Sequence, residues 1–209
     1  MLDIDHLFLT MLSIADHIPA LCRHIDQYVA LPSTDRELLA SMLKARRLLK
    51  RTYLLAEGEI CHFENFVVEG CFRMFYVDDK GIEHTLQFAV EGWWIADLES
   101  FLKKTPSSYY IEALENSVVL QIDAESQNKL YETAPLFERY FRILHQNAYI
   151  AQSKRILENI SRSGEDKYES FLQTYPQWQQ RIPQKYIASY LGITPVFLSK
   201  IRKQRANRR

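Results

Sequence analysis

The chain contains 209 residues, enough for two small domains, and 47% of them are hydrophobic, an ordinary proportion for a folded protein. Its formal net charge is zero, yet residues 1–149 hold 14 Lys and Arg against 22 Asp and Glu, whereas residues 150–209 hold 12 against 4. This asymmetry indicates an acidic body and a basic segment, so the neutral total does not exclude nucleic acid as a partner.

The cysteines and the N-terminus indicate the compartment. Cys22, Cys61 and Cys71 are odd in number and widely spaced, which argues against a disulfide framework and against an iron–sulfur site. Asp3 and Asp5 precede any apolar run, unlike the basic start of a signal peptide. No uncharged stretch approaches the length of about 18 residues that a membrane span needs. We therefore expect a cytoplasmic protein without a membrane partner.

Two helices are predicted near the N-terminus. Residues 18–29 carry apolar side chains at helical spacing, and Pro19 stands at the start of the expected helix. Thr34 and Glu37 have the spacing of a capping box, in which each side chain bonds a backbone N–H of the first turn. A second helix is therefore expected over residues 35–43.

Residues 46–123 have the pattern of an all-β unit. Short runs rich in Leu, Phe, Tyr and Val alternate with turns that contain glycine. This spacing favours a sandwich or barrel over a parallel sheet. Asp97 to Lys103 is expected to form a short helical turn. The expected strands are residues 52–55, 66–68, 71–77, 84–88, 109–113 and 118–122.

A long helix is predicted between Pro135 and Gly164, because the 28 residues between them include neither Gly nor Pro. Such a helix would be about 42 Å long. Its apolar residues follow 4-3 spacing before the phase slips, which is typical of a dimerisation stripe with a stutter, although packing on the chain's own β unit explains the stripe equally well. The residues of the stripe are Phe137, Phe141, Leu144, Ala148 and Ala151, then Ile156 and Ile160.

Residues 181–203 read as two helices joined by a tight turn. The first would begin after Pro183 and end at Leu191, and Gly192 can then adopt the positive φ that ends a helix without strain. Thr194 can cap the second helix, and Pro195 suits its first position. This is a helix-turn-helix pattern, and a plain helical hairpin with a solvated basic tail is the alternative. No Asp or Glu occurs after residue 169, so the segment is purely basic.

The chain is predicted to contain, in order, a β body punctuated by glycines, a glycine turn with a short helix, a long helix and a terminal helix-turn-helix. In this order of elements it resembles the Crp/Fnr family of bacterial transcription regulators. The resemblance covers roughly residues 46–202, most specifically in EGCFRMFYVDDKGIEHTLQFAVEGWWIADLESF and IPQKYIASYLGITPVFLSKIRK. It implies an α+β fold: an antiparallel β-roll (a double-stranded β-helix of the cyclic-nucleotide-binding type) with flanking helices, a long dimerisation helix and a C-terminal winged-helix-like helix-turn-helix domain.

The resemblance also implies the organisation and the partners. Residues 1–134 would form the N-terminal helices and an effector-binding-like β-roll, residues 135–163 the dimerisation helix and hinge, and residues 164–209 the DNA-binding domain. We therefore expect a homodimeric transcription regulator that binds a palindromic operator in double-stranded DNA, and not an enzyme. A small-molecule effector and RNA polymerase are further partners that the resemblance allows, and no cofactor or metal is expected.

The cyclic-nucleotide sensors of this family carry a phosphate-binding cassette after the glycine turn. Its Glu accepts a ribose hydroxyl, while its Arg and the helix amides hold the cyclic phosphate. The Glu falls on Asp97 here and the Arg on Ser107, so the arginine is missing. Losing one such charge-assisted contact costs about 10- to 150-fold in affinity. The aligned effector-binding candidates are Ala96, Asp97, Leu98, Ser107 and Ser108.

Two lysines and one further departure concern the same site. Lys103 and Lys104 are near in sequence, but they do not replace the arginine, because an ammonium does not reproduce the planar fork of a guanidinium. The polar pair with which the sensors reach adenine falls near Ile150 and Ala151. We therefore expect an effector domain that does not bind cyclic AMP in the usual way. The alternative is a cyclic-nucleotide-responsive regulator that uses a variant cassette.

The second helix of the terminal motif would enter the major groove. The family's base-reading positions fall on Pro195, Val196, Ser199 and Lys200, of which only Lys200 keeps a basic group. Val196 can contact a thymine methyl but cannot accept a hydrogen bond, so a different half-site is expected. The candidates for phosphate contacts are Gln184, Lys185, Thr194, Arg202 and Lys203.

Two other functions compete with this interpretation. A cupin-like enzyme would need a cluster of His and Glu ligands, and the sequence offers His84 next to Glu83, with His62 and His145 in separate elements. A protein-interaction module would use the basic helix to bind an acidic partner instead of DNA.

Overall fold

The computed structural model describes residues 13–207, which fall into two compact units. The first is formed by residues up to 74 together with residues 88–144, and the second by residues 75–87 together with residues 145 onward. Each unit is described by itself below.

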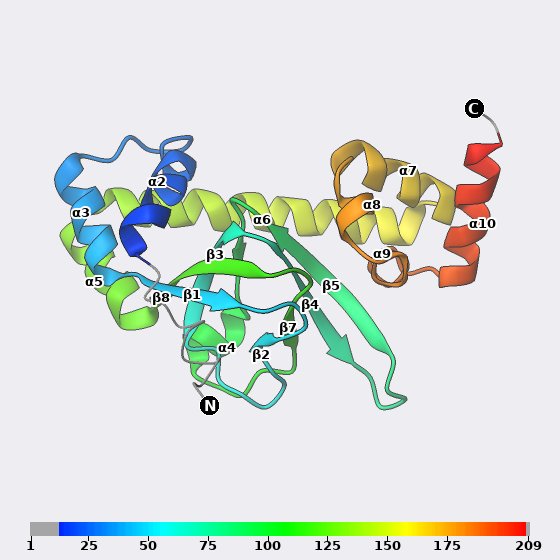
Figure 1. Cartoon of the computed structure of the whole chain (residues 1–209), viewed down its shortest axis with the longest axis horizontal. Helices are drawn as coiled ribbons and strands as arrows, with labels where there is room; N and C mark the ends of the chain where they lie inside the picture. Colours follow the sequence, from blue (N-terminus) through cyan, green and yellow to red (C-terminus); the bar gives the residue numbers. More distant parts are fainter. Residues whose placement is uncertain (1–12, 208–209) are drawn as a thin grey trace, which may run out of the picture. The chain divides into compact units, whose positions relative to one another are not determined.

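Helices of the first unit cover one sheet. They are α2 (Ile14–Ile25), α3 (Ser33–Met42), α5 (Ala124–Thr133) and the first part of α6 (Leu136–Ser161), and Figure 1 shows the first three gathered next to β1 and β8. The predicted helix after Pro19 begins earlier, so Pro19 lies inside α2. The predicted capping box is wrong, because α3 begins at Ser33 and its N-cap is Pro32 without a side-chain hydrogen bond. Helix α5 was not predicted, because its polar sequence lacks an apolar stripe.

Within residues 13–207, eight strands form two sheets. All six predicted strands are present, with ends that differ by no more than three residues. The first sheet has the order β1 (Lys44–Leu48), β8 (Ser117–Asp123), β3 (Phe63–Glu69), β6 (Trp94–Ile95). The second has the order β2 (Tyr53–Leu55), β7 (Tyr110–Ala113), β4 (Cys71–Val77), β5 (Glu83–Val90). The sequence missed β6, which has only two residues, and β1, an edge strand whose charged sequence does not read as apolar.

Strand alternation places two cores on the two faces of the first sheet. Phe66 and Leu120 face the helices, whereas their neighbours Val67 and Val119 face the second sheet. The core between the sheets also takes Phe72 from β4, so the two sheets close into the predicted β-roll. The glycines that separate the predicted strands, at positions 58, 70, 81 and 92, all have positive φ, as tight turns require.

The long helix contradicts part of the predicted dimerisation stripe. Phe137 and Phe141 are 0% and 3% exposed in the core of the first unit, and Leu144 packs against the same core. These residues therefore stabilise their own unit, which was the alternative explanation of the stripe. The other stripe residues, Ala148, Ala151, Ile156 and Ile160, are exposed, as are Tyr149, Ile150 and Leu157 of the same helix.

The second unit contains the C-terminal helices α7 (Gly164–Thr174), α8 (Trp178–Arg181), α9 (Gln184–Tyr190) and α10 (Pro195–Ala206). The sequence predicted α9 and α10 but neither α7 nor α8. Phe171 and Trp178 are buried, and the Tyr175 ring stacks on Trp178 with centroids 3.9 Å apart. Between residues 124 and 207 the described chain contains no strand, so the strand segments of this unit are the ends of β4 and β5.

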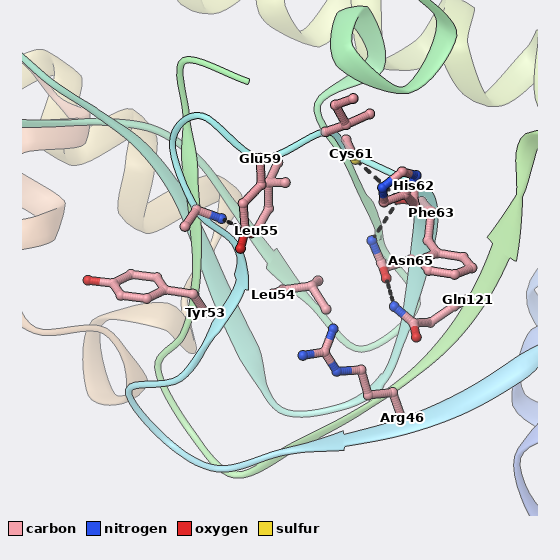
Figure 2. Close-up of a pocket in the computed structure, with 12 residues that line it drawn as sticks. Arg46, Tyr53, Leu54, Leu55, Glu59, Cys61, His62, Phe63, Asn65 and Gln121 are labelled. Atoms are coloured by element: carbon pink, nitrogen blue, oxygen red, sulfur yellow. Dashed lines mark hydrogen bonds between the residues drawn. The ribbon is translucent and has the colours of Figure 1, made fainter. Parts of the chain in front are cut away.

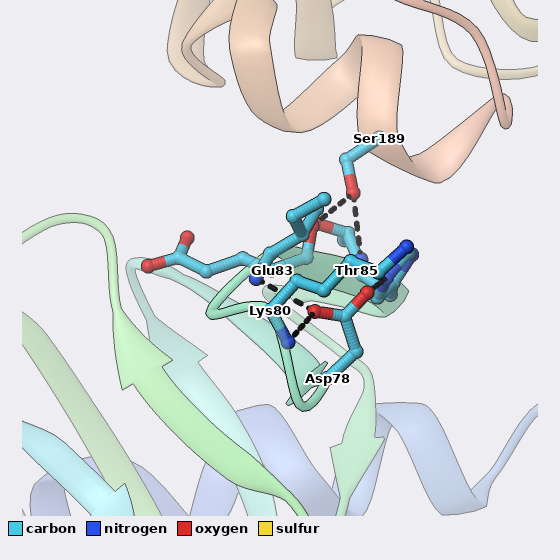
Figure 3. Close-up of polar contacts among 7 residues, drawn as sticks. Asp78, Lys80, Glu83, Thr85 and Ser189 are labelled. Atoms are coloured by element: carbon cyan, nitrogen blue, oxygen red, sulfur yellow. Dashed lines mark hydrogen bonds and ion pairs between the residues drawn. The ribbon is translucent and has the colours of Figure 1, made fainter.

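Residues 75–87, the end of the β4–β5 hairpin, are hydrogen-bonded to α9 within the second unit. Ser189 Oγ donates to the carbonyl of Glu83 and accepts from the N–H of Thr85, both over 2.8 Å (Figure 3). Asp78 Oδ1 accepts from the N–H of Lys80 over 2.9 Å and so holds the hairpin turn. One serine of α9 therefore continues the hydrogen bonding of β5.

The described residues include all three cysteines and can also be searched for membrane-spanning helices. Cys22, Cys61 and Cys71 are buried thiols outside any disulfide. Within residues 13–207, no helix is both long enough and apolar enough to cross a membrane.

Candidate functional site

The turn between α9 and α10 has the geometry that the sequence predicts. Gly192 has a φ of +66°, and Thr194 Oγ1 accepts a hydrogen bond from the N–H of Phe197 over 3.2 Å, so it caps α10. Pro195 occupies the first turn of α10. Ile187 and Leu198 are buried between the two helices. The two helices therefore form a helix-turn-helix with a packed core.

The side chains predicted to contact DNA lie on the outside of this motif. Arg202 is half-buried, and Val196 is 81% exposed at the start of α10. Arg205 forms an ion pair with Glu169 of α7, so this arginine already has an acidic partner. The exposed candidates are Gln184, Lys185, Thr194, Pro195, Val196, Ser199, Lys200 and Lys203. The surface therefore combines donors for phosphates with an apolar side chain at the helix start.

The residues aligned with the phosphate-binding cassette are hydrogen-bonded to one another. Asp97 is the N-cap of α4 (Leu98–Lys103), and its Oδ1 accepts from the N–H groups of Glu99 and Ser100 over 3.1 and 3.3 Å. Ser107 Oγ donates to Asp97 Oδ2 over 2.8 Å. Both side chains are buried, at 6% and 3% exposure. The carboxylate and the helix amides that would hold a ribose and a phosphate are therefore bonded to each other.

The remaining cassette residues contribute little to a closed site. Ala96 is half-buried, while Leu98 and Ser108 are exposed. Lys103 pairs with Glu99 over 2.8 Å at the surface, and Lys104 Nζ lies 5.0 Å from the centroid of the Phe101 ring. The two lysines are thus engaged locally on α4, and neither takes the place of the missing arginine.

Two residues that organise the second unit were not predicted. Ser189 and Arg155 bond backbone carbonyls about 35 to 106 positions away along the chain. Backbone partners leave no trace in the residue types, so no local pattern could identify these contacts. Among the described residues there is also no group of three or more His, Cys, Asp or Glu side chains placed to hold a metal ion.

The comparisons with known proteins agree with this fold. Residues 45–134 match the family model of the cyclic nucleotide-binding domain. Among curated proteins, none matches the sequence.

Solved structures match over most of the chain. The c-di-GMP-responsive global regulator CLP of Xanthomonas campestris is 14% identical, with a TM-score of 0.69 over 84% of this chain and 93% of that one. FixK2 of Bradyrhizobium japonicum is 15% identical, with a TM-score of 0.70 over 79% and 85%. A regulator of the crp/fnr family from Eubacterium rectale is 18% identical, with a TM-score of 0.65 over 83% of each chain. Residues 45–134 therefore belong to the cyclic nucleotide-binding domain family, and the chain has the fold of the Crp/Fnr transcription regulators.

Proposed function

We propose that this protein is a homodimeric, sequence-specific DNA-binding regulator of transcription whose effector domain does not bind cyclic AMP in the usual way. The observation that carries the proposal is the outer surface of α9 and α10. There, eight of the nine side chains predicted to contact DNA are exposed around a capped recognition helix. Helix α10 would enter the major groove, with Val196, Ser199 and Lys200 toward base edges.

The basic residues of this surface suit a polyanion. Lys200 and Lys203 lie one turn apart on α10, and no acidic residue follows Glu169 in the sequence. Lys185 adds a third ammonium from the first turn of α9. Lys185 and Lys203 would position the motif on phosphates, while Lys200 and the side chains at the start of α10 would provide the sequence specificity.

Dimerisation is supported by the exposed apolar side chains of α6. Tyr149, Ile156 and Ile160 follow 7-4 spacing and lie on one side of the helix at 100° per residue. Phe137 and Phe141, which pack on the first unit, lie roughly 80° to 120° around the helix from Tyr149 and so belong to a different face. Large apolar side chains with 60–80% exposure suit a partner helix. A two-fold dimer would present two reading helices to half-sites about 34 Å apart.

The effector proposal rests on the cassette. In the described structure the Asp97 carboxylate accepts three hydrogen bonds, from two helix amides and from Ser107. A ribose hydroxyl and a cyclic phosphate would have to displace these bonds and would lack the arginine. RNA polymerase remains a partner suggested by the family resemblance alone.

The decisive experiment is an in vitro selection from random duplexes with the purified full chain at fixed salt. One arm contains a nucleotide mixture that includes cyclic AMP and cyclic di-GMP, because the Xanthomonas regulator is described as responsive to the latter. We expect a palindromic motif in both arms. A motif only with nucleotides would refute the effector part of the proposal.

Control variants make the selection specific to the proposed surface. Lys200→Glu reverses a charge on α10, whereas Lys129→Glu reverses an exposed charge on α5. Enrichment should be lost only with the first. Absence of any motif with the unaltered protein in either arm, or equal enrichment with both variants, would count against DNA reading by α10.

A further inference from the structure

A cavity of about 650 Å³ opens in the first unit beside the β2–β3 connection. It is large enough for a small organic ligand. Side chains of β1, β3 and β8 line it, together with residues 53–56 and 59–62 of β2 and the connection that follows (Figure 2). Asp97 and Ser107 do not line it, so it is separate from the cassette.

Arg46 supplies the positive charge of this cavity. It lies on β1 opposite Val119 of β8, and Figure 2 shows its guanidinium directed toward Leu54. Among residues 13–207 it has neither a hydrogen bond nor an ion pair. An unpaired guanidinium on a cavity wall presents a planar fork of donors that matches an oxyanion.

A fixed amide lies beside Arg46. Gln121 is buried, and its Nε2 donates to Asn65 Oδ1 over 2.7 Å. Asn65 Nδ2 in turn donates to the carbonyls of Phe63 and Ile95, each over 3.0 Å, so both Asn65 hydrogens are used. These bonds set the orientation of the Gln121 amide, and one hydrogen of its Nε2 has no acceptor among the described residues. It can be donated to a ligand carboxylate.

The other walls limit the ligand class. Leu54, Leu55, Ile60 and Phe63 contribute apolar surface. Glu59 contributes a carboxylate, whose Oε2 accepts from the N–H of Ala56 over 2.9 Å. One cation and one anion leave the lining neutral, which disfavours a polyanion such as a nucleoside triphosphate. A single negative charge with an apolar body fits both features.

We propose that this cavity binds a small organic monocarboxylate, with its carboxylate on Arg46 and its apolar body against Leu55 and Phe63. This goes beyond the proposed function, because binding does not require that the protein bind DNA.

The wall of the cavity is also joined to the cassette segment. Gly58 N–H donates to the carbonyl of Ser107, and Ser107 N–H donates to the carbonyl of Glu59, each over 2.8 Å. Cys61 N–H donates to Ser100 Oγ of α4 over 2.8 Å. A ligand that moves the β2–β3 connection would therefore move the segment that carries Asp97 and Ser107.

The test is a titration of the full chain with small molecules. The NMR resonances of the Asn65 and Gln121 side-chain amides report binding. The probes are benzoate, its neutral analogue benzamide, and inorganic phosphate. We expect saturable shifts with benzoate at a dissociation constant of about 1 mM or lower, a range that a ligand of this size can reach. Benzamide and phosphate should bind at least about tenfold more weakly, because each lacks one of the two features.

The neighbouring arginine provides the matched control. Arg46 and Arg47 are adjacent and both exposed, and alternation places Arg47 on the other face of β1 from Arg46. Arg46→Gln should weaken benzoate binding about tenfold or more, whereas Arg47→Gln should leave it unchanged. If Arg46→Gln does not fold, Arg46→Lys replaces it and should weaken binding in the same direction.

Three outcomes would overturn the proposal. They are no saturable shift with benzoate, equal binding of benzoate and benzamide, and equal effects of the Arg46 and Arg47 substitutions. Phosphate binding as tightly as benzoate would show a bare anion site and would overturn the ligand class. None of these readouts depends on DNA, so failure here is distinguishable from failure of the proposed function.

Discussion

The guanidinium carbon of Arg155 lies 4.0 Å from the centroid of the Tyr190 ring, a cation–π contact between α6 and the end of α9. The same guanidinium donates to the carbonyls of Thr85 and Tyr190, both over 3.3 Å, and to the carbonyl of Leu86. Its burial lowers the pKa of Arg155. One side chain therefore holds three backbone segments of the second unit together.

Replacing Arg155 should destabilise the protein. Arg155→Met keeps much of the volume but leaves carbonyl oxygens without their donor, and we expect a loss of about 2 kcal/mol or more in the free energy of unfolding. The loss of stability in Arg155→Lys should lie between zero and that of Arg155→Met, because an ammonium cannot reach all three carbonyls. Urea unfolding measures the effect. Lys154→Met, at the exposed neighbouring position, is the control, and an equal loss in both variants would contradict the role of Arg155.

Stability should fall on mild acidification because of His24. Trp94 Nε1 donates to the Tyr140 hydroxyl over 2.7 Å, and that hydroxyl lies 2.8 Å from His24 Nδ1, where it can donate its own proton to a neutral imidazole. The rings of Tyr28 and Phe66 also face the imidazole. Burial lowers the pKa of His24 below its ordinary value of 6.5.

The sign of this effect follows from proton linkage. The unfolded state binds the proton more readily, so the contribution of His24 is complete above about pH 6.5. It is lost as the pH falls toward the pKa in the folded protein, by up to about 1.4 kcal/mol per pH unit. Urea midpoints between pH 7.5 and 5 measure it. His24→Gln should flatten the dependence, and His62→Gln, at an exposed position, should not.

Cyclic AMP should leave the melting temperature unchanged at about 0.1 mM. The Asp97 carboxylate is already hydrogen-bonded to Ser107 and to two helix amides, and no arginine is present to hold the phosphate. A site with a dissociation constant near 1 μM would instead stabilise the protein by about 2.7 kcal/mol at that dose. Differential scanning fluorimetry separates the two outcomes, and a clear upward shift would refute the prediction.

Lys203→Ala should weaken binding to the selected duplex and make it less sensitive to salt. If Lys203 contacts a phosphate, the slope of log affinity against log salt should fall by about one. Fluorescence anisotropy at several salt concentrations measures both quantities. Lys129→Ala should change neither, and an unchanged slope in Lys203→Ala would remove this residue from the backbone contacts.

Ile160→Asp should weaken the dimer. Ile160 is 80% exposed, and burying an aspartate in an apolar seam is unfavourable. Sedimentation velocity should show a shift toward monomer at micromolar concentration, without loss of the helical signal. Ala151→Asp, on the opposite side of α6, is the control. A dimer that survives Ile160→Asp unchanged would place the interface elsewhere.

The sequence by itself determined the elements whose cause is local. Gly192, Thr194 and Pro195 predict the end of α9 and the cap of α10, because positive φ, a capping hydroxyl and a fixed φ act within a few residues. The glycine turns and apolar runs predict six strands for the same reason. The order of these elements was then sufficient to indicate the family.

Only the tertiary structure decided which surfaces are available. The stripe of Phe137, Phe141 and Leu144 is periodic whether it packs on its own unit or on a second copy, and burial assigns it to the first unit. Strand β1 forms despite its charges because β8 pairs with it. The hydrogen bond from Ser107 to Asp97 and the contacts of Arg155 join residues distant in sequence. Folding likewise brings Arg46 to the wall of a cavity that other strands line. Such contacts depend on packing rather than on local residue pattern, which is why the sequence alone could not predict them.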